Sequence, residues 1–148
     1  MKNLTAIIDT GSSDNIMGHE YLPLIEHKFI TKETKSFSTV GDNVVSIGQI
    51  ETFVPILGDT VKFSVLKSEA NRVPILIGCP YIKSRGGCID LMGGVLHVNG
   101  RSIYLRDCGG LPTMDTGFLV HMNGVGINER EELQIMLVNS TESFNSVK

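Results

Sequence analysis

The sequence lacks the features that mark nucleic-acid-binding and membrane-spanning proteins. Its 148 residues carry a net charge of −3, and Lys and Arg form no run, which argues against a nucleic-acid groove. No apolar stretch approaches the length of a membrane span, and the N-terminus shows no signal-peptide pattern. We therefore expect no nucleic-acid partner and no membrane partner.

Cysteine is scarce, and no side chains form an obvious metal site. The three cysteines, Cys79, Cys88 and Cys108, are odd in number and do not have the spacing of metal ligands. They are typical of buried thiols in a reducing compartment. No convincing serine or cysteine triad is present, although the chain has four histidines. The sequence thus predicts no metal, no cofactor and no covalent serine or cysteine chemistry.

The most informative stretch is the apolar pair Ile7-Ile8 followed by Asp9-Thr10-Gly11-Ser12-Ser13. The two β-branched residues predict a buried strand that delivers a carboxylate into a tight turn. Glycine allows close backbone approach, and the hydroxyls and N–H groups can hold the acid in one orientation. A solvated turn is the alternative for this stretch taken alone.

A second pattern lies between Val73 and Leu91. An apolar strand ends at Gly78, and Pro80 stands where the first turn of a helix tolerates proline. Gly86 and Gly87 predict the end of this short helix, and another strand follows.

Turn signals divide the rest of the chain into short strands. They are Gly41-Asp42-Asn43, Gly58-Asp59 and Asn99-Gly100, each between runs with strand character. Many short strands with one short helix predict a closed, all-β, barrel-like domain.

Together, the Asp9-Thr10-Gly11-Ser12 strand end, the glycine-bearing hairpin and the Ile77-Gly78 helix start resemble the retropepsin family of aspartic proteases. The resemblance covers residues 4–105 and implies the fold of that family, with the active site at a homodimer interface. It makes Asp9, Thr10 and Gly11 of each subunit the catalytic residues and places Gly78 under the catalytic loop. Only eight residues precede Asp9, so we expect a weak dimer.

The resemblance also implies a substrate-binding set. Ser12 stands beside the acid, and Gly41, Asp42 and Asn43 match the tip of the family's mobile flap, a hairpin that closes over an extended peptide. An ordinary exposed hairpin turn is the alternative for Gly41–Asn43.

The composition changes after Arg106. We predict a protease domain over residues 1–106 and a linker with a C-terminal extension over residues 107–148. The extension is expected to hold a linker at 108–112, a strand at 118–122 and a short helix beginning near Asn128. It also repeats the tripeptide as Asp115-Thr116-Gly117, but a Gly/Pro-rich stretch precedes this copy and Phe118 follows it, so we do not expect a catalytic acid there.

These patterns predict an aspartic endopeptidase that hydrolyses peptide bonds through a water held between two Asp9 carboxylates of a homodimer. By resemblance, its substrate is a viral or transposon polyprotein, and its location is the cytoplasm or a virus-like particle. The alternative is a catalytically silent module of the same fold that dimerises or binds peptides.

Overall fold

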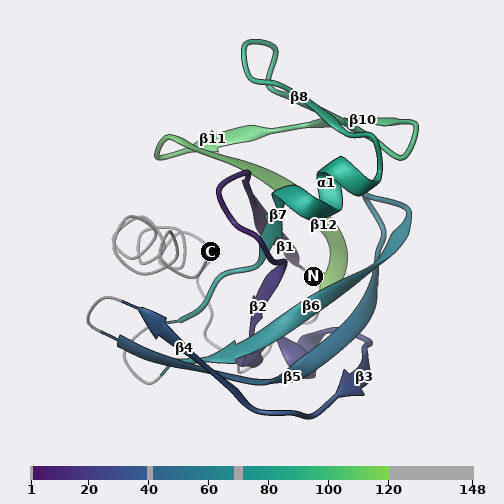
Figure 1. Ribbon diagram of the computed structural model, residues 1–148. Coiled ribbons are helices and arrows are strands. Elements are labelled where there is room, and N and C mark those ends of the chain that lie inside the picture. The colour runs from purple at the N-terminus through teal and green to yellow at the C-terminus, as the bar shows by residue number, and fades with distance from the viewer. Residues whose placement is uncertain (1, 40–41, 69–71, 121–148) are drawn as a thin grey trace.

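A computed structural model describes residues 2–39, 42–68 and 72–120 of the chain, and these residues are mostly β-strand (Figure 1). They contain one six-residue α-helix, α1, and one six-residue 3-10 helix, η1. The elements in chain order are β1 (Lys2–Asp9), β2 (Ile16–Gly18), η1 (His19–Leu24), β3 (Lys28–Thr31), β4 (Lys35–Thr39), β5 (Asp42–Val54), β6 (Asp59–Lys67), β7 (Leu76–Gly78), α1 (Cys79–Ser84), β8 (Cys88–Asp90), β9 (Val95–Val98), β10 (Arg101–Tyr104), β11 (Arg106–Cys108) and β12 (Leu111–Val120).

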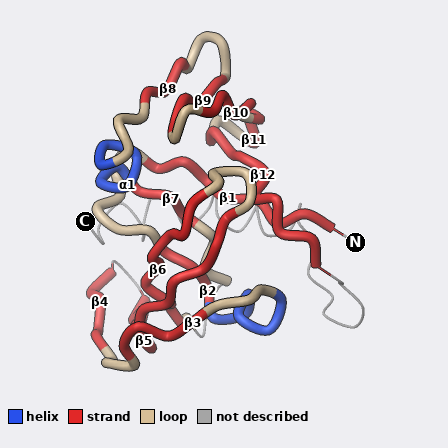
Figure 2. The backbone as a smooth tube through the Cα atoms, turned by 90° about the vertical axis from the view of Figure 1, so that its right-hand side faces the viewer, coloured by secondary structure: helices blue, strands red, loops and turns tan. Residues whose placement is uncertain are grey.

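Nine of the strands form one sheet in the order β11-β12-β1-β7-β2-β6-β5-β3, with β4 also paired to β5. Strand β1 lies inside this sheet, third from the β11 edge, parallel to β7 and antiparallel to β12. Strands β8, β9 and β10 form a separate antiparallel sheet, which Figure 2 shows at one end of the molecule. Helix α1 lies between this small sheet and the long β5–β6 hairpin (Figure 1).

Both faces of the central strands are buried. Ala6 and Ile8 of β1 belong to the main core, whereas Ile7 packs in a second, smaller cluster with Leu76 of β7. Burial on both sides explains why the run 6–8 of β1 and the first two residues of β7 are apolar without alternation. The strand that leads to Asp9 is therefore held firmly on each side.

Several predicted elements are confirmed. The turn at Asn99-Gly100 joins β9 to β10, with φ of 54° and 70° at its two residues, as this dipeptide favours in a tight hairpin. Helix α1 starts directly after Gly78, has proline in its first turn, and is followed by Gly86 with a φ of 63°. The hairpin expected around Gly58 is formed by β5 and β6.

Two predictions about the sheet are wrong. No closed barrel is found in the described part of the chain, because the pairing path ends at β11 on one side and at β3 on the other. The linker expected at residues 108–112 is instead a hairpin between β11 and β12. Strand β12 continues the main sheet beside β1, so the sheet extends beyond residue 106.

The proposed division of the chain at residue 106 stays a prediction. The helix expected near Asn128 lies outside the described residues. None of the described helices has the length and apolar character needed to cross a membrane.

Candidate active site

Asp9 is the last residue of β1 and lies opposite Gly78, the last residue of β7. Because β1 and β7 are parallel, both strands end at the same edge of the sheet. Asp9 itself is partly exposed, and Thr10 beside it is exposed. The strand pair thus presents a carboxylate and a hydroxyl residue at an accessible edge of a rigid frame.

Backbone N–H groups orient the acid from within its own turn. The Gly11 N–H donates to Asp9 Oδ1 at 2.9 Å, and the Ser12 N–H donates to the Asp9 carbonyl at 3.1 Å. A carboxylate that accepts a backbone hydrogen bond loses much of its rotational freedom. The turn therefore holds one carboxylate oxygen and leaves the other available.

Gly78 supports this turn from the neighbouring strand, as predicted. A Cβ at position 78 would lie 2.6 Å from the Asp14 carbonyl oxygen and 2.9 Å from that of Ser12, so only glycine fits. The next residue, Cys79, donates its N–H to the Ser12 carbonyl at 3.0 Å. The end of β7 and the start of α1 thus fix the path of residues 9–14.

The structure places the predicted substrate-binding residues in two different settings. Ser12 is buried at 5% exposure, and its hydroxyl donates to the Asp14 carbonyl at 2.7 Å, which favours a role in shaping the turn. Asp42 and Asn43 pair with Thr39 and Ser38 in the β4–β5 hairpin. Gly41 lies outside the described residues, so the flap and its contacts stay a prediction.

The second Asp-Thr-Gly copy repeats the local geometry of the first. The Gly117 N–H donates to Asp115 Oδ1 at 2.8 Å, and the Thr116 hydroxyl donates to the Leu4 carbonyl at 2.8 Å. Asp115 lies opposite Thr5 in the β1–β12 ladder. Asp9 lies four positions after Thr5 along the strand, a distance of roughly 13 Å. The two acids of one chain are therefore too far apart to share a proton.

This position of Asp115 differs in one respect from the expectation. The tripeptide lies within strand β12, at an irregularity where the β1–β12 register shifts, and not after a linker. The Thr116 carbonyl accepts the Ile56 N–H at 3.2 Å, and Gly117 has a φ of 80° close to Pro55. The second copy thus fastens β12 to β1 and to the β5–β6 turn.

A pocket of about 410 Å³ lies beside the end of the Asp9 turn. The turn contributes Ser13, Asp14 and Asn15 to its wall, and β6 and α1 contribute most of the rest. Asp9 does not line it. The pocket separates the turn from the polar network that anchors α1.

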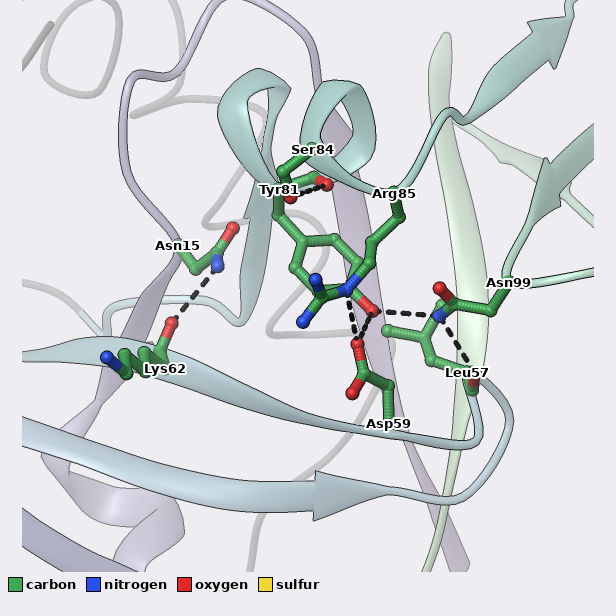
Figure 3. A network of polar contacts seen from close by, with 8 residues as sticks. All are labelled: Asn15, Leu57, Asp59, Lys62, Tyr81, Ser84, Arg85 and Asn99. Carbon is green, nitrogen blue, oxygen red and sulfur yellow. Dashed lines mark hydrogen bonds and ion pairs between the residues drawn. The ribbon is translucent and has the colours of Figure 1, made fainter.

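That network joins three elements through Tyr81 of α1 (Figure 3). The Tyr81 hydroxyl donates to Asp59 Oδ2 at 2.8 Å and accepts a hydrogen bond from the Asn99 side chain at 3.0 Å. Arg85 Nε donates to the same Asp59 oxygen at 2.7 Å. The hydrogen bond from Arg85 is the main cause that lowers the pKa of Asp59. Sequence reasoning missed this network, because its members lie on separate elements.

Comparison with known proteins gives little more. No family model matches the sequence, and no curated protein matches it. Among solved structures, the chain is similar to the retroviral protease-like domain of Ddi1 from Leishmania major, with 16% sequence identity and a TM-score of 0.45. The similarity covers 77% of this chain and 86% of that chain.

Proposed function

We propose that the chain is an aspartic endopeptidase whose active site forms between two copies. The single observation that carries the proposal is the Asp9 turn. A buried strand ends in a partly exposed carboxylate, the Gly11 N–H fixes one of its oxygens, and Gly78 fixes the turn.

The chemistry needs two carboxylates. Two such groups about 3 Å apart cannot both ionise, so the pair holds one proton. The ionised member takes a proton from a water between them, and the protonated member donates to the carbonyl oxygen of the scissile peptide. The water oxygen thereby bonds to the carbonyl carbon and gives a tetrahedral diol. The acid that took the proton from water then donates it to the peptide nitrogen, and the C–N bond breaks as a diol proton returns to the other acid, with no covalent bond between enzyme and substrate.

The second carboxylate must come from another copy of the chain. Asp115 is excluded as the partner by its place opposite Thr5, roughly 13 Å along β1 from Asp9. A two-fold axis beside the exposed Thr10 would bring two Asp9 residues together. Each subunit would then supply one acid and one turn.

The two tripeptide copies provide a matched test. Asp9→Asn should abolish cleavage of an unstructured peptide substrate, because an amide cannot share a proton, whereas Asp115→Asn should retain cleavage when both variants are folded. Both substitutions keep an oxygen that can accept the glycine N–H. Retained turnover in Asp9→Asn would refute the assignment, and selective loss in Asp115→Asn would point to a single-chain acid pair.

Assembly can be tested with the same variant. Specific activity should fall on dilution, because the dimer dissociates. When the two are mixed, Asp9→Asn chains should inhibit wild-type chains by forming mixed dimers. Activity that stays proportional to enzyme concentration in a sedimentation-defined monomer would contradict the shared site.

We further propose that the substrate is an extended segment of a polyprotein, bound under the β4–β5 hairpin as in the family that the sequence resembles. The rival function is a silent module that dimerises or binds peptides. It predicts no cleavage by the wild-type dimer and peptide binding that Asp9→Asn leaves unchanged.

A further inference from the structure

Asn15 closes the turn that carries Asp9, just before β2 begins. Its side chain reaches two other strands (Figure 3 shows the bond to Lys62). Nδ2 donates to the Lys62 carbonyl of β6 at 3.0 Å, and Oδ1 accepts the Gly78 N–H of β7 at 2.8 Å. The backbone carbonyl of Asn15 also accepts the Ser64 N–H at 2.9 Å. One residue thus joins the end of the turn to both β6 and β7.

The two partners define the orientation of the amide. A backbone carbonyl only accepts and a backbone N–H only donates, so Nδ2 must face Lys62 and Oδ1 must face Gly78. Aspartate could serve the Gly78 N–H but, when ionised, would turn an oxygen toward the Lys62 carbonyl. Among side chains of this length, only asparagine makes both bonds at neutral pH.

Gly78 is the residue that lies opposite Asp9 in the β1–β7 ladder. Its N–H points away from β1, toward β2, where the ladder contains only the pair Ile16 and Leu76. The Asn15 amide continues this ladder by one hydrogen bond, at the level of the catalytic acid. Gly78 is therefore paired with Asp9 in the β1–β7 ladder and hydrogen-bonded to Asn15 on its other side.

We infer that Asn15 is a positioning residue, which sets the place of Asp9 through Gly78. This inference rests on the proposed function for its catalytic consequence. It also states that a change at Asn15 weakens the hydrogen bond from the Gly11 N–H to Asp9, and this can be measured whether or not the protein cleaves peptides.

The first test uses amide signals of the wild-type chain and of two variants. In Asn15→Ala, exchange of the Gly78 N–H should accelerate at least about tenfold, because its partly buried acceptor is gone. The decisive signal is the Gly11 N–H, which Asn15 does not touch but which should also exchange faster and shift. Asn99→Ala is the matched control, since the Asn99 side chain donates to the Leu57 carbonyl and to Tyr81 and not to residues 9–15. It should leave the Gly11 signal unchanged. A Gly11 signal that is the same in Asn15→Ala and in the wild type would overturn the inference.

The second test uses the pH profile of Asn15→Asp. When protonated, aspartic acid can donate to Lys62 and accept from Gly78, as asparagine does. The variant should therefore approach wild-type kcat at acid pH and lose at least about tenfold as its carboxyl ionises, with KM changed much less. A purely structural role would lower the folded fraction without moving the profile of the folded enzyme, and such an unmoved profile would overturn the inference. A wild-type chain that cleaves nothing would instead remove the proposed function and leave the Gly11 result standing.

Discussion

Gly78→Ala tests whether the support beneath the Asp9 turn controls activity. The added Cβ would lie 2.6 Å from the Asp14 carbonyl oxygen, about 0.8 Å closer than the 3.4 Å at which ordinary contacts begin. A second clash, at 2.9 Å, involves the Ser12 carbonyl oxygen. Both atoms are backbone, so the turn must move to relieve the overlap.

The expected magnitudes follow from this forced movement. Overpacking of a well-packed site costs about 1–3 kcal/mol, which corresponds to a fall in Tm of roughly 3–10 °C for a chain of this size. A displacement approaching 1 Å at a catalytic group lowers the rate by about 100-fold. We therefore expect kcat/KM of Gly78→Ala to fall by about two orders of magnitude, measured well below its Tm.

Gly93→Ala is the control for this substitution. Gly93 is exposed between β8 and β9, and its added Cβ would meet only the side chain of Asp90, which is exposed and can move. This variant should keep wild-type kcat/KM. A Gly78→Ala chain with wild-type Tm and wild-type kcat/KM would refute the reasoning that the turn rests on Gly78.

Other perturbations test the frame around the site. Asp59→Asn should lower Tm at neutral pH, because the pKa of Asp59 is lowered in the fold and its ionised form therefore stabilises the folded state. The difference in Tm from wild type should shrink as the pH falls below the ordinary pKa of 3.8 and vanish below the lowered pKa. A difference that grows toward acid pH would contradict this. Tyr81→Phe should cost about 1–2 kcal/mol in urea unfolding, since Asp59 and Asn99 each lose a partner, and an unchanged midpoint would refute the network. Truncation after Arg106 should abolish cooperative unfolding monitored by circular dichroism, because it removes β12 and its fully buried Met114. A truncated chain with a cooperative transition would show that β12 is dispensable.

The local parts of the site could be predicted from the sequence. Short sequence patterns predict Asp9, Gly78 and the Asn99-Gly100 turn, because a strand end or a tight turn depends on a few adjacent residues. Only the end of strand β12 is predicted, as a strand at 118–122, since Gly109, Gly110 and Pro112 resemble a linker when the pairing with β1 is unknown. That pairing is a tertiary contact, and no local pattern reports it.

The positioning contacts were missed for a related reason. Asn15 looks like an ordinary turn residue, and its role appears only when Lys62 and Gly78 are brought beside it, 47 and 63 residues along the chain. Arg85 and Asp59 are likewise 26 residues apart. The sequence shows which hydrogen bonds each side chain can donate or accept, but its partner depends on which residues the fold brings beside it.

The position of β1 inside the sheet affects when the protein can fold during its synthesis. The Thr116 hydroxyl and the Leu4 carbonyl that it contacts are 112 residues apart, so this strand gains its antiparallel neighbour late in synthesis. Such distant pairings raise the contact order and slow folding, because loop closure precedes the stabilising contacts. A nascent chain that carries the Asp9 turn still lacks β12, the strand that covers one edge of β1. The sheet around Asp9 can therefore be completed only after β12, the last strand that the structure describes, has left the ribosome.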